Sequence, residues 1–132
     1  MRRLLLTIAL ATLALPLGCD TTAPEEAYVG TYTLVRLDGR SLPTSYLSTT
    51  IVASSLTLNR DDTFSRTITY TASTETQTGT WSWMRDSGEF RFVLADGTRL
   101  FYGFAAEDDK GSGLELQSGL DLQSSSMWSY RR

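Results

Sequence analysis

Residues 63–73 read Thr63-Phe64-Ser65-Arg66-Thr67-Ile68-Thr69-Tyr70-Thr71-Ala72-Ser73. A hydroxyl side chain stands at every second position, and the positions between carry mostly apolar side chains. Successive side chains of an extended strand point to opposite faces, so this alternation predicts a β-strand with one face toward water and one toward a core. We expect Phe64, Ile68 and Tyr70 to be buried, and Thr67 and Thr69 to face water.

Similar short segments flank this strand in both directions. They are rich in β-branched and aromatic residues, turn residues separate them, and no window has a convincing helical period. The further strands that we expect are 29–37, 51–59, 76–84, 89–94, 99–106 and 126–132. Asp96-Gly97 predicts a type I′ hairpin turn, which needs a positive φ at both positions.

A small internal repeat supplies the remaining strand region, 113–124. Gly113-Leu114-Glu115-Leu116-Gln117-Ser118 is followed by the near-copy Gly119-Leu120-Asp121-Leu122-Gln123-Ser124. This could be one bulged strand or two registers of the same strand. Eight short strands with one apolar face each favour an all-β, up-and-down antiparallel β-barrel, because closure removes the exposed edges of an open sheet. A two-sheet sandwich is the alternative, but a last strand that could pair with the first favours closure.

The start of the chain has the features of an export signal. Arg2 and Arg3 precede an uncharged, largely apolar run over residues 4–15, which is shorter than the roughly 20 residues needed to span a bilayer. The ending Leu17-Gly18-Cys19 resembles the bacterial lipobox, in which the cysteine carries a diacylglycerol. We therefore expect a signal peptide over 1–18, a lipidated Cys19 with a flexible tether over 19–27, and a domain over 28–132. An ordinary cleaved signal is the alternative.

This interpretation implies a cell-envelope lipoprotein that is anchored to a bacterial membrane through Cys19. Cys19 is the only cysteine, so no disulfide can form within the chain. A lone free thiol would be a liability in an oxidising compartment, whereas a lipidated thiol is consumed. Several acyl chains on one residue anchor a protein firmly.

Composition excludes several classes of function. Without Arg2 and Arg3 the chain has ten basic and fifteen acidic residues, a net charge of −5, which argues against binding nucleic acid. The absence of histidine excludes Ser-His and Cys-His nucleophilic sites and histidine-ligated zinc.

The acidic residues fall mostly at turns, so the pattern places no pair of carboxylates where they could act in acid–base catalysis. We therefore expect a non-enzymatic protein with no cofactor. The acidic stretch 107–113 lacks the spacing of a calcium loop, so we expect a solvated turn there and no metal site.

Several motifs resemble the lipocalin-like domains of bacterial envelope lipoproteins, a group largely of unknown function. They are Gly30-Thr31-Tyr32-Thr33-Leu34-Val35 followed by Asp38-Gly39 and Leu42-Pro43, Leu56-Thr57-Leu58-Asn59 leading to Thr63-Phe64, Gly79-Thr80-Trp81, Ala95-Asp96-Gly97-Thr98, and Tyr130-Arg131-Arg132. The resemblance implies an eight-stranded calyx-type barrel.

Arg66 stands out because it shares the predicted inner face with Phe64 and Ile68. A buried guanidinium needs an anionic partner, from a ligand or from the protein. The alternatives are that Arg66 reaches water at the barrel mouth, or pairs with Glu75 or Glu89. The residues that we expect to line a ligand cavity beside it are Tyr32, Tyr70, Trp81, Trp83 and Tyr102, with Phe90, Phe92 and Phe104.

Two functional hypotheses follow, both for a monomer. The first is a lipoprotein whose barrel binds a small apolar or amphipathic molecule. The second is an interaction or inhibitor module that uses its barrel surface or mouth loops. An eight-stranded barrel holds either one small ligand or only its own side chains, so an interior cavity would favour the first hypothesis and a filled interior the second.

Overall fold

A computed structural model describes residues 24–97, 99–108, 111–118 and 126–132. The predicted signal peptide, Cys19 and most of the predicted tether lie outside these residues. The described elements are the 3-10 helix η1 (Pro24–Tyr28) and the strands β1 (Gly30–Leu37), β2 (Arg40–Ser41), β3 (Thr44–Tyr46), β4 (Thr49–Leu58), β5 (Thr63–Tyr70), β6 (Thr74–Met84), β7 (Glu89–Leu94), β8 (Arg99–Asp108), β9 (Gly111–Ser118) and β10 (Ser126–Arg131).

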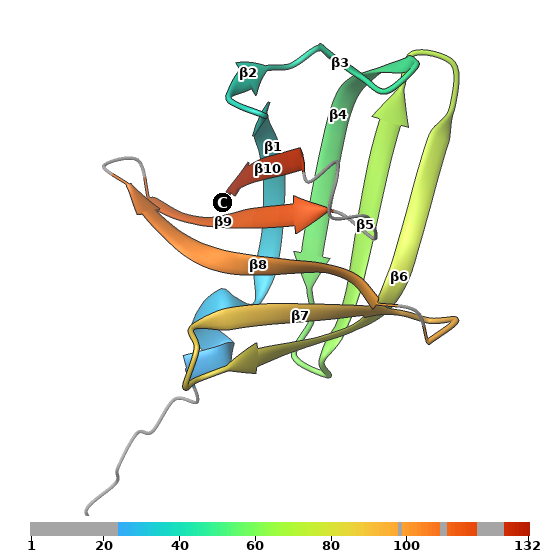
Figure 1. Ribbon diagram of the computed structural model, residues 1–132. Coiled ribbons are helices and arrows are strands. Elements are labelled where there is room, and N and C mark those ends of the chain that lie inside the picture. Colours follow the sequence, from blue (N-terminus) through green and yellow to red (C-terminus); the bar gives the residue numbers. More distant parts are fainter. Residues whose placement is uncertain (1–23, 98, 109–110, 119–125) are drawn as a thin grey trace, which may run out of the picture.

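The strands close into the predicted antiparallel barrel. Going round it, β1 is followed by β4, β5, β6, β7, β8, β9 and β10, and β10 pairs with β1 again. The closing contact between β1 and β4 runs from Gly30 opposite Leu58 to Thr33 opposite Ser55. The all-β class, the eight-stranded antiparallel barrel and the pairing of the first strand with the last are confirmed (Figure 1).

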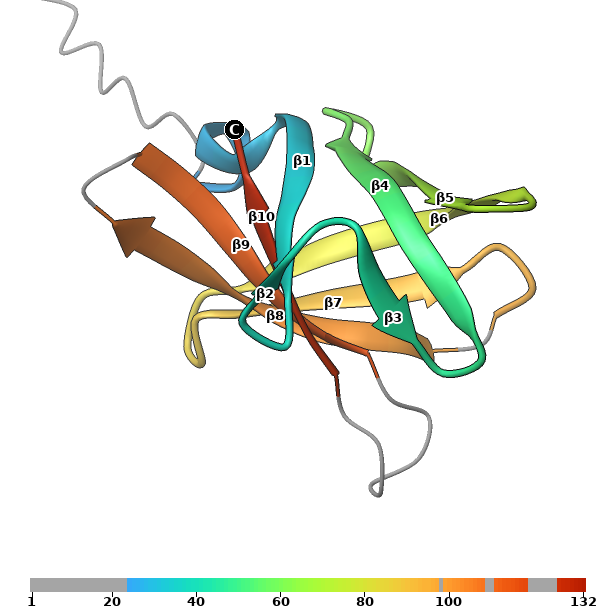
Figure 2. The same ribbon diagram turned by 90° about the horizontal axis from the view of Figure 1, so that it is seen from above.

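The strands β2 and β3 were not predicted. They form in the connection between β1 and β4, where those two strands separate, and each extends the pairing of one of them. Leu42 and Tyr46 from this segment pack against the core at the end of the barrel that faces the viewer in Figure 2. The ring of Tyr46 lies 5.3 Å from the ring of Trp128, measured between centroids.

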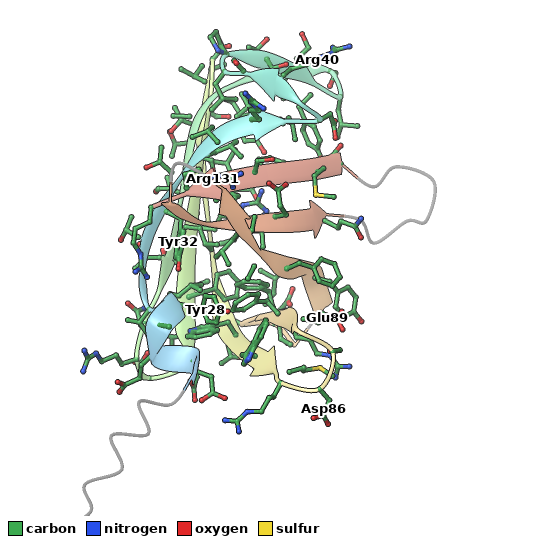
Figure 3. All side chains as sticks on the ribbon, turned by 90° about the vertical axis from the view of Figure 1, so that its left-hand side faces the viewer. Tyr28, Tyr32, Arg40, Asp86, Glu89 and Arg131 are labelled. Carbon is green, nitrogen blue, oxygen red and sulfur yellow. The ribbon has the colours of Figure 1, made fainter. Side chains whose placement is uncertain are left out.

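The opposite end of the barrel is covered by η1. The ring centroid of Tyr28 lies 5.2 Å from that of Trp83 and 4.8 Å from that of Phe90. Figure 3 shows Tyr28 and Asp86 toward this end and Arg40 at the other. Residues 24–27, assigned from sequence to a flexible tether, therefore belong to a helix whose last residue packs on the core. No helix in the described ranges is long and apolar enough to cross a bilayer.

The prediction of which β5 side chains face the core and which face water is confirmed for the centre of the strand. Phe64, Arg66 and Ile68 are 2 to 3% exposed, while Thr67 and Thr69 are partly exposed on the other face. Tyr70, expected to be buried, is only half-buried. The core that these residues join is Tyr32, Leu34, Leu37, Ile51, Leu56, Leu58, Phe64, Ile68, Trp81, Phe90, Phe92, Leu114, Leu116, Trp128 and Tyr130, each at most 3% exposed.

The hairpins after β7 and β8 differ in detail from the prediction. Only Gly97 of the Asp96-Gly97 pair has a positive φ (83°), and its amide donates to the carbonyl of Leu94. A longer loop therefore replaces the predicted two-residue type I′ turn.

The strands β8 and β9 are longer than predicted, and their pairing continues until Asp108 stands opposite Gly111. The predicted solvated turn over 107–113 is therefore wrong for residues 107–108 and 111–113, which are paired. The second copy of the internal repeat, 119–124, lies outside the described residues.

The strand β6 pairs with different neighbours along its length. It pairs with β5 from Thr74 to Thr80 and with β7 from Gly79 to Met84, so only two positions are shared (Figure 1). A Cβ at Gly79 would clash with the backbone carbonyl oxygen of Val93. Only glycine allows β6 and β7 to approach this closely, which explains why the strand can change partners there.

Candidate functional site

Arg66 is held inside the barrel by polar and aromatic partners from distant strands. Its Nε donates to the Tyr130 hydroxyl over 3.0 Å, and that hydroxyl forms a second hydrogen bond of 2.8 Å with Ser54 Oγ. The guanidinium carbon lies 4.0 Å from the ring centroid of Trp128. A desolvated cation over a tryptophan face is stabilised by about 2 kcal/mol. These contacts fix the position and orientation of the charge.

Three further polar side chains near this arginine come from β5 and the neighbouring strand β6. Gln77 stands directly opposite Arg66 on β6, and its amide nitrogen donates to Glu75 over 2.7 Å. The hydroxyl of Tyr70 donates to the same carboxylate over 3.3 Å. Glu75 is exposed, and Tyr70 and Gln77 are half-buried. These three side chains therefore form a second hydrogen-bonded group, which reaches solvent at Glu75.

The name Arg66 cluster is used below for Arg66, Ser54, Tyr130, Trp128, Tyr46, Tyr70, Glu75 and Gln77. Burial is the largest influence on the phenol of Tyr70 and raises its pKa. The negative charge of Glu75 and the hydrogen bond to it raise this pKa further, whereas the positive charge of Arg66 lowers it. The phenol therefore lies within the electrostatic influence of both a cation and an anion.

The burial of Arg66 removes one of the alternatives considered for it. Its inward orientation is confirmed, and the alternative in which it reaches water at a barrel mouth is ruled out, because the residue is only 2% exposed. Glu75, one of the two carboxylates considered as a partner, accepts hydrogen bonds from Tyr70 and Gln77.

The predicted lining residues do not gather around Arg66. Only Tyr70 lies in the Arg66 cluster. Three others lie toward the η1 end: the Tyr32 hydroxyl donates to the carbonyl of Tyr28, the Trp81 indole donates to the carbonyl of Asn59, and Trp83 packs on Phe90. These aromatic rings pack together at the η1 end of the barrel.

Tyr102 and Phe104 lie on the outside of the barrel, contrary to the prediction. Phe90 and Phe92 are fully buried, so Arg91 between them faces outward, and Tyr102 is paired opposite Arg91. Phe104 is 45% exposed. Gly103 takes the inward position between these two rings, opposite Phe90.

Three members of the site were not singled out from the sequence. Trp128 and Tyr130 stand two positions apart in the last strand, and this alternation is the signal in the sequence that both point to the same face. Tyr46 lies on an unpredicted strand. Nothing in the local sequence placed any of them near Arg66.

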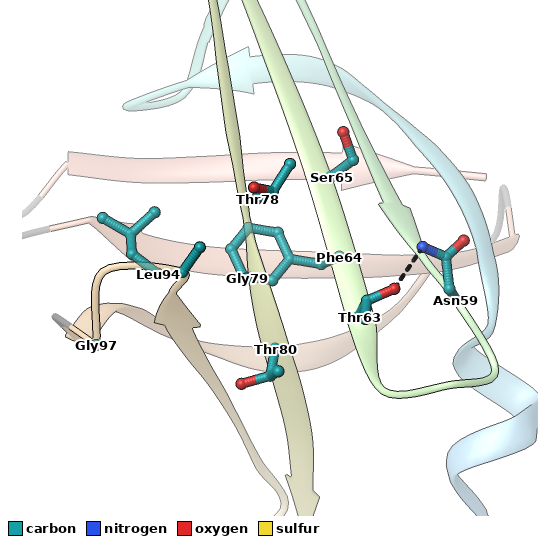
Figure 4. Close-up of a pocket in the computed structure, with 10 residues that line it drawn as sticks. Asn59, Thr63, Phe64, Ser65, Thr78, Gly79, Thr80, Leu94 and Gly97 are labelled. Carbon is teal, nitrogen blue, oxygen red and sulfur yellow. Dashed lines mark hydrogen bonds between the residues drawn. The ribbon is translucent and has the colours of Figure 1, made fainter.

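A groove of about 580 Å³ lies on the outer side of the barrel where β6 bends (Figure 4). Its lining includes Asn59, Thr63, Ser65, Thr78, Thr80 and Leu94. A smaller hollow of about 160 Å³ near η1 is lined by Glu25, Asp62, Trp81, Ser82 and Trp83. In the part of the chain that the structure describes, no three metal-binding side chains cluster.

Comparison of the chain with protein-family models, curated proteins and solved structures finds no match. The resemblance to lipocalin-like domains therefore depends on the sequence motifs alone. Any functional conclusion for this chain has to be argued from the geometry of its own residues.

Proposed function

We propose that the protein is a non-enzymatic lipoprotein of the bacterial envelope, anchored through Cys19, and that its barrel binds a small amphipathic anion at the Arg66 cluster. The observation that carries this proposal is the fixed guanidinium of Arg66, which is stacked on Trp128 and whose residue stands opposite the half-buried Gln77 in the β5–β6 pairing. An immobilised cation beside aromatic rings suits a ligand with a charged head and an apolar tail.

Preorganisation is the physical basis of this site. The hydrogen bond to Tyr130 and the stacking on Trp128 already fix Arg66, so a ligand need not order the side chain. The ordering of such a side chain otherwise costs about 0.5–1.5 kcal/mol on binding. Tyr46 and Tyr70 are both half-buried, and their rings offer apolar area at the same end of the barrel.

Glu75 provides an internal test, because its carboxylate lies where it would repel an incoming anion. A dansyl-labelled fatty acid, titrated into the protein by fluorescence, is a suitable probe. Arg66→Gln removes a charge-assisted contact of about 1.5–3 kcal/mol and should weaken binding roughly ten- to a hundredfold. Glu75→Gln keeps the shape of the side chain but removes the like charge, so binding should become tighter.

Arg60→Gln is the matched control, since Arg60 is an exposed arginine in the turn before β5. It should leave the affinity unchanged. Equal weakening by Arg60→Gln and Arg66→Gln would mean that only net charge matters. No saturable binding at tens of micromolar would refute the proposal.

The anchor has a separate test. Mass spectrometry of the membrane-bound protein should show an N-terminal Cys19 that carries a diacylglyceryl group. Cys19→Ser should release the protein from the membrane fraction. A mature chain that begins at another residue would contradict the lipoprotein assignment without affecting the ligand site.

A protein-interaction module is the second candidate function, and Leu47 favours it. This residue is 82% exposed at the tip of the β3–β4 hairpin and has a positive φ of 52°, which is unusual for leucine. A photo-crosslinking amino acid at position 47 should trap a discrete partner in intact cells, whereas one at Arg85, in the hairpin between β6 and β7, should not. Identical products from both positions would count against this alternative.

A further inference from the structure

The hydroxyl face of β5 continues onto the neighbouring strands. Cross-strand pairing places hydroxyl side chains side by side in rows on the outside of the barrel. Two of these rows are Thr33, Ser55, Thr67 and Thr76, and Thr31, Thr57, Ser65 and Thr78. The hydroxyls of Thr31 and Thr57 lie 2.9 Å apart, within hydrogen-bonding distance. Over these four strands neither row contains a charged residue, although a fifth of the chain is charged; the first row meets Arg131 where β1 pairs with β10.

The outer groove lies at one end of this face (Figure 4). The Thr63 hydroxyl there is already satisfied, because it accepts from the Asn59 amide over 2.9 Å and donates to Asp61 over 2.6 Å. By contrast, the hydroxyls of Ser65, Thr78 and Thr80 make no hydrogen bond within the described ranges. They border the groove with their donors and acceptors available to a ligand.

The rigidity of the groove follows from contacts behind it. The Trp81 indole donates to the backbone carbonyl of Asn59 over 3.1 Å, which ties the β4–β5 turn to the core. The ring of Phe64 packs edge-on against Phe92, and together with Leu94 it contributes the apolar part of the lining. The site therefore has a fixed wall, a small apolar area and a hydroxyl rim.

This chemistry excludes most classes of ligand. Anionic polymers and anionic membranes need a basic surface, and none of the residues lining the groove is charged. Protein interfaces are enriched in aromatic residues, Met and Arg and depleted in Ser, whereas the rows on this face consist of threonine and serine. Each hydroxyl can donate one hydrogen bond and accept two. A neutral polyhydroxylated ligand matches that capacity without leaving any charge unpaired.

We infer that the groove binds a neutral saccharide. Hydroxyl groups of the sugar would exchange hydrogen bonds with Ser65, Thr78 and Thr80, and the C–H face of a ring would lie toward Leu94 and Phe64. A volume of about 580 Å³ falls within the range of about 300–1,000 Å³ usual for small-molecule sites. The site is separate from the Arg66 cluster, so this inference does not depend on the proposed function.

Isothermal titration calorimetry of the full-length protein tests the inference. The protein is held in a detergent without sugar groups, and chitotriose, maltotriose and cellotriose are the probes. At least one of them should bind saturably at millimolar concentration. Thr78→Lys places a long cationic side chain in the groove and should weaken that binding about tenfold.

Thr74→Lys is the matched control. Thr74 is an exposed threonine on the same face of the same strand, four residues or about 13 Å from Thr78. It should leave the affinity within about twofold of the parent, because it lies outside the groove. Equal weakening by both lysines would overturn the inference.

Two further outcomes would also overturn it. One is the absence of saturable heat for all three sugars. The other is binding that survives Thr78→Lys but is lost in Tyr70→Phe, which would place the sugar at the Arg66 cluster. Failure of the dansyl-labelled fatty acid to bind, by contrast, would refute the proposed function and leave the saccharide site untouched.

Discussion

The hydroxyl of Tyr130 is the most informative single group to remove. Tyr130 is fully buried, and its oxygen accepts from Arg66 Nε over 3.0 Å and lies 2.8 Å from Ser54 Oγ. Arg66 and Ser54 are themselves only 2% and 4% exposed. Tyr130→Phe deletes one oxygen and keeps the ring, so it removes both hydrogen bonds with minimal change in packing.

The magnitude follows from the burial of the two partners. A hydrogen bond to a charged group contributes about 1.5–3 kcal/mol and one between neutral groups about 0.5–1.5 kcal/mol, and water cannot easily replace either here. We expect Tyr130→Phe to lower the free energy of unfolding by about 2–4 kcal/mol. That is a large part of the roughly 5–15 kcal/mol typical of a domain of this size.

Urea unfolding followed by tryptophan fluorescence measures this change, and Tyr32→Phe is the matched control. Tyr32 is equally buried, but its hydroxyl contacts the carbonyl of the half-buried Tyr28 and the side chain of the exposed Arg132. Water can replace those contacts, so Tyr32→Phe should cost only about 1 kcal/mol. If Tyr130→Phe costs no more than Tyr32→Phe, the buried network around Arg66 does not exist as described.

Three further predictions concern the barrel and its turns. Trp81→Ala should lower the free energy of unfolding by about 3–5 kcal/mol, because the side chain is 3% exposed; a thermal melt within a degree or two of the parent would contradict this. Gly79→Ala should destabilise by at least about 1–3 kcal/mol, because its Cβ would meet the Val93 carbonyl and only backbone movement relieves that contact; an unchanged urea midpoint would show that the strands do not approach so closely. Hydrogen bonds from the Thr63 side chain and amide lower the pKa of Asp61 below its usual 3.8, so its stabilising effect is present above that pH and is lost as the pH falls through the lowered value. Asp61→Asn should therefore flatten the acid limb of a stability–pH profile, and an unaltered acid limb would count against the Asp61–Thr63 contacts.

The barrel could be predicted wherever alternation between polar and apolar residues was strict. In β5 every second residue is Thr or Ser, so the faces of its centre could be assigned without knowing the neighbouring strands. In β8 aromatic residues occupy consecutive positions, and alternation does not say which face is inner. The register with β7, which shifts by a bulge between Phe92 and Val93, places Tyr102 outside.

The strands β2 and β3 could not be predicted, because alternation gives no signal in them either. The two-residue β2 and three-residue β3 are too short to show a period of two. They form because β1 and β4 diverge and leave backbone groups that the connecting segment can pair with. Such strands are products of tertiary structure, and local sequence does not specify them.

The candidate site could be predicted only in part. Arg66 was found because it interrupts an apolar face, a signal contained within one strand. Its main partners lie more than sixty positions later in the chain, at Trp128 and Tyr130. They could be brought to Arg66 only by knowing how the barrel closes.

The pairing of β10 with β1 has a consequence for how the molecule is made. Before β10 has been synthesised, both β1 and β9 present a row of unpaired backbone groups, and the core lacks Trp128 and Tyr130. Contacts so distant in sequence form slowly, since a long loop must close first. The growing chain is therefore exposed to strand-to-strand aggregation until β10 is available, and the barrel can close only in a late step of folding.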